Sequence, residues 1–242
     1  MKAKLLCLAL VVGWLYCSGQ KKGIDRVRGI VDSWKVAVYS DTTETDYIFL
    51  KDLMMGKSGL ENIGLFELNG KFYMKPIRVK WAKSYDDCNQ DSTDVAVTFG
   101  EGNCYLLFYN FIDYNSDPID AVNEGKLIEM PPNTAFDFTY NGVKYKLKTE
   151  GEEDNSNTKN YKLYICRKGC KKEQVLVNHE LVESAYIEIL FIGDLDGDSK
   201  PDIILNAPTN YENRYIMLFL SSTRRKGELL HLEASDFNWF DC

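Results

Sequence analysis

Four aspartates lie close together in the segment FIGDLDGDSKPDIIL, which runs from Phe191 to Leu205 and is otherwise largely apolar. They are Asp194, Asp196, Asp198 and Asp202. Carboxylates this close repel one another strongly unless a hard cation neutralises them. A loop with the spacing D-x-D-x-D-x-x-x-D can wrap such a cation. The chemistry that this segment predicts is therefore cation binding through oxygen atoms.

Calcium is the cation we expect, because it accepts many oxygen ligands in a flexible geometry. The predicted ligands are the side chains of Asp194, Asp196 and Asp198, the backbone carbonyl of Lys200, and the side chain of Asp202, directly or through water. Gly197 would allow the tight reversal of the loop, and Pro201 would stiffen its exit. The alternative interpretation is a solvated acidic turn without metal.

The residues around the loop predict strands rather than helices, because IEILFIG precedes it and DIIL follows it. The loop also departs from the EF-hand pattern, with Ser199 in place of the glycine and Leu205 in place of the final glutamate. It resembles instead the calcium loops of FG-GAP and VCBS-type repeats, and it is similar to dockerin-type loops. This resemblance implies calcium held between strands. Propellers of the FG-GAP kind carry several such loops and this chain has one, so the propeller fold is not implied.

A wider resemblance covers several scattered segments. GLFELNGKFYMKP, YDDC, GDLDGDSKPDIIL and LFLSS, with a cysteine near the C-terminus, together look like a group of exported bacterial proteins of unknown function. The resemblance implies a protein of the bacterial envelope, and it implies no particular activity.

The first nineteen residues have the pattern of a signal peptide. Lys2 and Lys4 precede an apolar run from Leu5 to Tyr16, which is too short to span a bilayer. Cleavage after Gly19 would leave residues 20–242 as a single domain. The alternative is lipidation of Cys17, which would anchor the protein at the outer membrane. We therefore expect an exported protein, periplasmic or secreted, without a transmembrane segment.

The charge balance narrows the choice of partners. The chain has 29 basic and 36 acidic residues. Removing Lys2 and Lys4 with the signal peptide leaves 27 against 36, a net charge of −9. This sign disfavours nucleic acid and anionic membranes. A protein or carbohydrate partner is compatible with the aromatic content of 13%, although Trp34, Trp81 and Trp239 are also ordinary core residues.

Five cysteines remain after removal of the signal peptide: Cys88, Cys104, Cys166, Cys170 and Cys242. In an oxidising compartment we expect two disulfides and one free thiol. The spacing of Cys166 and Cys170 suits the two ends of a hairpin turn. Cys88 would pair with either Cys104 or Cys242, and the sequence does not decide between them.

Alternating apolar residues predict that the fold is mostly β. FDFTYNGVKYKLK and LFELNGKFYMK each predict a hairpin with an Asn-Gly turn. Further strands are predicted in DVAVTFGEGNCYLLFY, YKLYICRKGCKKEQVLV and YIMLFLSS. Helical turns are expected only within Ile24–Val38 and Tyr47–Met55, and a polar loop is expected at Thr149–Asn160. The predicted fold is an antiparallel sandwich or open barrel with minor α-helix.

Catalytic motifs are weak by comparison. HELVE at His179 lacks the second histidine of a zinc-protease helix, and neither a G-x-S-x-G elbow nor a phosphate loop occurs. We expect an exported calcium-binding domain with a structural or binding role. The alternative is a secreted hydrolase that acts on carbohydrate through surface carboxylates. That alternative requires a deep cleft with two carboxylates about 5 to 9 Å apart.

Overall fold

A computed structural model describes the backbone of residues 29–32, 36–38, 62–76, 78–86, 91–99, 103–109, 111, 113–169 and 172–239. These residues form sixteen strands and no helix. The prediction of a mostly β protein with antiparallel sheets is therefore confirmed. The predicted signal peptide and the sequence pattern at Tyr47–Met55 lie outside the described residues.

The strands form four open sheets. The central sheet has the order β16-β15-β14-β13-β8, with β8 at Ile128–Met130, β13 at Ile187–Gly193, β14 at Asp202–Asn206, β15 at Asn213–Leu220 and β16 at His231–Trp239. A second sheet has the order β12-β11-β10-β9, with β9 at Ala135–Tyr140, β10 at Val143–Asp154, β11 at Asn157–Arg167 and β12 at Gln174–Glu183. A third has the order β1-β7-β3-β4, with β1 at Gly29–Asp32, β3 at Asn62–Leu68, β4 at Lys71–Pro76 and β7 at Asn103–Tyr109. The fourth has the order β2-β6-β5, with β2 at Val36–Val38, β5 at Arg78–Asp86 and β6 at Asp91–Phe99.

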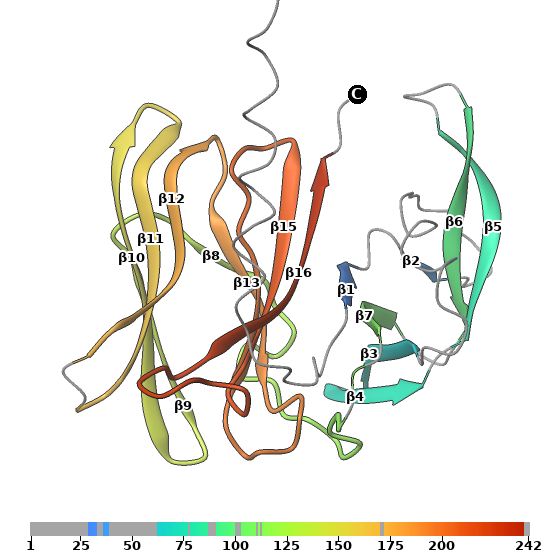
Figure 1. Cartoon of the computed structure of the whole chain (residues 1–242), viewed down its shortest axis with the longest axis horizontal. Helices are drawn as coiled ribbons and strands as arrows, with labels where there is room; N and C mark the ends of the chain where they lie inside the picture. Colours follow the sequence, from blue (N-terminus) through green and yellow to red (C-terminus); the bar gives the residue numbers. More distant parts are fainter. Residues whose placement is uncertain are drawn as a thin grey trace, which may run out of the picture.

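The central sheet is covered on both faces, so it forms the middle layer of a three-layer sandwich (Figure 1). Alternation along β14 shows this directly, because Ile203 and Leu205 pack into one apolar core and Ile204 packs into the other. The first core lies against the β9–β12 sheet and contains Leu147 and Leu163. The second lies against the β1-β7-β3-β4 sheet. A strand buried on both faces explains the continuous apolar run in DIIL.

Both Asn-Gly hairpins form as predicted. Asn69 and Gly70 join β3 to β4 with φ of 54° and 75°, and Asn141 and Gly142 join β9 to β10 with φ of 45° and 75°. Two successive residues with positive φ give the turn a twist that matches the flanking strands.

Two local predictions are wrong. Thr149–Asn160 is not a loop, because β10 continues to Asp154 and β11 starts at Asn157. The prediction of a loop rested on the polar composition of this segment. Two of its polar residues, Thr149 and Thr158, are nevertheless buried and face the protein interior. Ile24–Val38 contains two strands, β1 and β2, where a helical turn was expected.

The strands of DVAVTFGEGNCYLLFY are present as β6 and β7, but they belong to different sheets. β6 pairs with β5 and, in parallel, with β2, whereas β7 pairs with β1 and β3. Among the residues that the structure describes, none belongs to a helix that could cross a membrane.

Candidate metal centre

The aspartate loop connects two neighbouring strands of the central sheet, as the sequence predicted. It leaves β13 at Gly193 and enters β14 at Asp202, and these two residues are paired across the strands. Gly197 has a φ of 76°, which suits glycine and confirms the predicted site of reversal. Ser199 also has a positive φ, at 65°. Two residues in the left-handed region allow the loop to curl back on itself.

Three of the aspartates converge. Oxygen atoms from Asp194, Asp196 and Asp202 all lie within 4.8 Å of one another, a separation that would let one cation contact all three. Asp202 is completely buried and Asp194 is 8% exposed. A set of purely oxygen donors with negative charge, partly removed from water, is suited to a hard cation.

Asp202 joins the loop to two other parts of the chain. Its Oδ2 accepts a hydrogen bond from the backbone N–H of Leu195 at 2.8 Å, and its Oδ1 accepts one from the backbone N–H of Ser221 at 2.8 Å. Leu195 lies within the loop, while Ser221 directly follows β15. This carboxylate therefore closes the base of the loop and also connects it to the adjacent strand.

Asp194 organises the middle of the loop. Its Oδ1 accepts a hydrogen bond from the N–H of Asp198 at 3.0 Å, and its Oδ2 accepts one from the N–H of Ser199 at 2.9 Å. The loop backbone thus wraps around this side chain. Asp196 is held from outside the loop, since its Oδ2 accepts a hydrogen bond from the hydroxyl of Ser222.

Asp198 is not one of the three converging aspartates. Its Oδ2 lies 2.6 Å from the Nζ of Lys200, and its Oδ1 accepts a hydrogen bond from the hydroxyl of Ser221 at 2.8 Å. The sequence predicted Asp198 as a metal ligand and assigned only the backbone carbonyl of Lys200 to the metal. In the structure these two side chains form an ion pair beside the three carboxylates.

The pKa of Asp198 is shifted in the opposite direction to the pKa values of the other three aspartates. Burial, followed by the negative charge of Asp196, raises the pKa of Asp202 well above its usual value. Burial also raises the pKa of Asp194 and of Asp196. Burial has the same direction at Asp198, but hydrogen bonds from Lys200 and Ser221 outweigh it and lower the pKa of that carboxyl. Ionisation is therefore disfavoured for the three converging carboxyls, whereas Lys200 compensates the charge of Asp198.

Two asparagines attach the loop to the surrounding layers. The side chain of Asn115 donates to the carbonyl of Asp194 at 3.1 Å, and its backbone N–H donates to the carbonyl of Leu195 at 2.7 Å. From the β9–β10 turn, Asn141 donates to the carbonyl of Ser199 at 2.8 Å. The neighbouring Tyr140 has a pKa raised to about 12 by burial and by the charge of Asp194.

These supporting residues were not assigned to the site from the sequence. Asn115 and Asn141 are remote in sequence from the aspartates, and Asn141 was interpreted only as a turn residue. In the sequence, Ser221 and Ser222 were only the last two residues of the predicted strand YIMLFLSS. Ser221 and Ser222 reach the loop only because β15 ends beside it. That position depends on the pairing of β14 with β15, which no local sequence pattern indicates.

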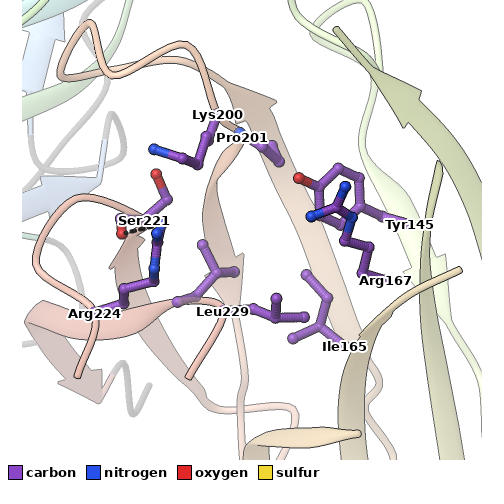
Figure 2. A pocket seen from close by; sticks show the side chains of 9 residues that line it. Tyr145, Ile165, Arg167, Lys200, Pro201, Ser221, Arg224 and Leu229 are labelled. Carbon is purple, nitrogen blue, oxygen red and sulfur yellow. Dashed lines mark hydrogen bonds between the residues drawn. The ribbon is translucent and has the colours of Figure 1, made fainter. Parts of the chain in front are cut away.

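A pocket lies beside the loop, between β10 and β11 on one side and the connection from β15 to β16 on the other (Figure 2). None of the described residues that line it is acidic. The pair of carboxylates that a carbohydrate hydrolase needs is therefore not present in this pocket.

The predicted disulfide between Cys166 and Cys170 stays a prediction. Cys166 on β11 is half-buried and forms no disulfide within the described residues, and Cys170 lies outside them. Cys88 and Cys242 also lie outside them, and of Cys104 only the backbone is described.

Comparisons with protein-family models, with curated proteins and with solved structures gave no match.

Proposed function

We propose that this protein is an exported calcium-binding domain of the bacterial envelope, in which the ion fixes the β13–β14 loop and gives the domain a structural or binding role. Asp194, Asp196 and Asp202 are the direct ligands in this proposal. The observation that carries it is the convergence of these three carboxylates within 4.8 Å, with Asp202 completely buried. Buried like charges destabilise a fold unless a cation compensates them.

The connections of the loop support a structural role. Hydrogen bonds join it to the end of β15, to the β9–β10 turn of the neighbouring sheet, and to the segment around Asn115. An ion that fixes this loop would therefore hold two layers of the sandwich together. Loss of the ion would leave uncompensated charge at the point where the layers meet.

Calcium is preferred over magnesium on coordination chemistry. Magnesium requires a small octahedral shell and gives up its water reluctantly, whereas calcium accepts a larger and less regular set of oxygens. A loop that supplies several carboxylates from one short segment suits calcium better.

Thermal unfolding with calcium, with magnesium and without metal tests the proposal. With a dissociation constant 100-fold below the calcium concentration, bound calcium would stabilise the fold by about 2.7 kcal/mol. The corresponding rise in Tm is about 2 to 4 °C per kcal/mol for a domain of this size. Magnesium should give a much smaller rise.

The variants Asp196→Ala and Glu180→Gln make the test specific. Asp196→Ala should abolish the response to calcium. Glu180 is exposed on β12, outside the loop, so Glu180→Gln should keep the full response. Identical unfolding curves for the wild type with calcium and without metal would refute a metal role for the loop.

A further inference from the structure

Three basic side chains line the pocket beside the aspartate loop, although the chain as a whole has a net charge of −7. Arg167 comes from the end of β11, Arg224 from the connection between β15 and β16, and Lys200 from the loop itself. Figure 2 shows Arg167 and Arg224 on opposite sides of the pocket. Because Lys200 is paired with Asp198, the two arginines supply the net positive charge at this concave site of an acidic protein.

Neither Arg167 nor Arg224 forms an ion pair with a carboxylate of the residues that the structure describes. Within the described part of the chain, Arg167 has no ion-pair partner, and Arg224 donates only to the backbone carbonyl of Ser221, at 3.3 Å. Both are exposed, so the guanidinium groups are accessible from solution. Guanidinium groups match the planar, paired oxygens of carboxylate, sulfate and phosphate, which makes free arginines in a pocket suitable for an oxyanion.

The floor of the pocket is apolar. Ile165 is completely buried and Leu230 is 2% exposed, and both line the pocket together with Pro201. The cavity has a volume of about 170 Å³. An apolar cavity of roughly 150 Å³ is large enough for benzene, so the space accommodates one ring-sized body. A ligand that fits both the floor and the arginines combines a compact apolar body with one anionic group.

Tyr145 completes the polar side of the pocket. Burial raises the pKa of its hydroxyl, while the positive charges of Arg167, Lys200 and Arg224 act in the opposite direction. The negative charge of Asp198 adds to the rise. A neutral hydroxyl at this position can donate a further hydrogen bond to a bound oxyanion.

We propose that this pocket binds a small organic oxyanion, with a carboxylate, sulfate or phosphate group held by Arg167 and Arg224 and a ring-sized body resting on the apolar floor. The proposal goes beyond calcium binding and does not depend on it, because none of the three side chains proposed as direct metal ligands lines the pocket; Lys200, whose backbone carbonyl was a predicted ligand, lines it with its side chain.

The test is a titration of the purified protein, followed by NMR chemical-shift changes, at one calcium concentration. The probes are benzoate, phenyl sulfate and phenyl phosphate, with benzyl alcohol as the neutral analogue and acetate as the anion without a ring. At least one aromatic anion should saturate and shift the signals of residues around Tyr145 and Leu230. Benzyl alcohol and acetate should bind at least about tenfold more weakly, because each lacks one of the two contacts. The three aromatic anions also identify which oxyanion is preferred.

Three variants separate the pocket from general surface charge. Arg167→Gln and Arg224→Gln should each weaken binding of the preferred probe about tenfold, the usual effect of losing one charge-assisted hydrogen bond. Arg225 follows Arg224, is also exposed and does not line the pocket, so Arg225→Gln should change the affinity less than about twofold. Unchanged unfolding curves would verify that all three variants are folded.

Absence of saturable binding by every aromatic anion would overturn the proposal. Equal weakening by Arg225→Gln and Arg224→Gln would also overturn it, because a diffuse positive surface would then explain the binding.

Discussion

The carboxylate of Asp202 accepts a hydrogen bond at 2.8 Å from the backbone N–H of Ser221, nineteen residues further along the chain. Its other oxygen accepts a hydrogen bond from the N–H of Leu195 inside the loop. A single buried side chain therefore connects the loop, the start of β14 and the end of β15. This arrangement gives Asp202 a role in the fold in addition to its proposed role as a metal ligand.

Asp202→Ala should be more damaging than Asp196→Ala in the presence of calcium. Both substitutions remove one proposed ligand, but Asp202→Ala also leaves the N–H groups of Leu195 and Ser221 without their acceptor. Unsatisfied buried donors cost about 1 to 3 kcal/mol each. We expect the free energy of unfolding of Asp202→Ala to lie at least about 2 kcal/mol below that of Asp196→Ala. Urea denaturation of both variants measures the difference, and equal values would show that the two backbone hydrogen bonds contribute nothing.

The position of the loop could be predicted from the sequence, whereas its internal division of roles could not. Spacing and apolar flanks identify four aspartates between two strands, because strand alternation and turn chemistry are local properties. The separation of Asp198 from the other three depends on Lys200 and on Ser221, which reaches the loop only through the pairing of β14 with β15. The three-layer arrangement could not be predicted either. The apolar run of β14 indicates burial on both faces, but it does not indicate which sheets cover them.

This division of roles predicts a difference between Asp196→Asn and Asp198→Asn. Asp196 belongs to the converging trio, whereas Asp198 is paired with Lys200. Asp196→Asn should weaken calcium binding by at least about 100-fold, since it removes a charged ligand, and Asp198→Asn by about tenfold, the lower end of the range for an outer-shell change. Calorimetric titration with calcium measures both affinities. An equal loss in the two variants would restore Asp198 to the direct ligands that the sequence predicted.

The serines that follow β15 should show a parallel difference. Ser222 donates to Asp196, and Ser221 donates its hydroxyl to Asp198. Removing a hydrogen bond that orients a metal ligand typically reduces affinity about 10- to 100-fold. Ser222→Ala should fall in this range, and Ser221→Ala should have a smaller effect because its backbone N–H still reaches Asp202. The same calcium titration tests both, and a larger loss in Ser221→Ala would contradict this assignment.

Gly193, the last residue of β13, should tolerate no side chain. A Cβ atom there would lie 2.8 Å from the ring of Phe191 and 2.9 Å from a side-chain carbon of Ile119. Phe191 itself packs edge-on against Phe72, with ring centroids 5.1 Å apart, so it has little room to move. Gly193→Ala should lower the free energy of unfolding by about 1 to 3 kcal/mol, the usual cost of overpacking a core. Because the clash lies in the core, the loss should be equal with and without calcium. A loss confined to the calcium-loaded protein would place the defect in the loop instead.

The raised pKa values in the loop predict that pH acts in opposite directions on the metal-free and the calcium-loaded protein. Asp202 has an unfolded pKa near the usual aspartate value of 3.8 and a folded pKa well above it. In the metal-free protein, the folded state therefore binds the proton more tightly, so this group stabilises the fold fully below pH 3.8 and loses that contribution as pH rises through the folded pKa. In the calcium-loaded protein, protons compete with the ion for the same oxygens, so acidification should reduce the stabilisation by calcium.

Urea denaturation of metal-free and calcium-loaded protein across a series of pH values measures both effects. His179 acts against the first effect, because burial lowers its pKa below 6.5 and its contribution to stability is lost as pH falls below that value. Comparison with metal-free Asp202→Asn removes this background, since the variant keeps His179 and lacks the titrating carboxyl. On lowering the pH from neutrality, metal-free wild type should gain free energy of unfolding relative to metal-free Asp202→Asn. A constant difference between the two across the series would mean that Asp202 is already ionised in the metal-free fold, and that its buried charge is compensated by the surrounding hydrogen bonds.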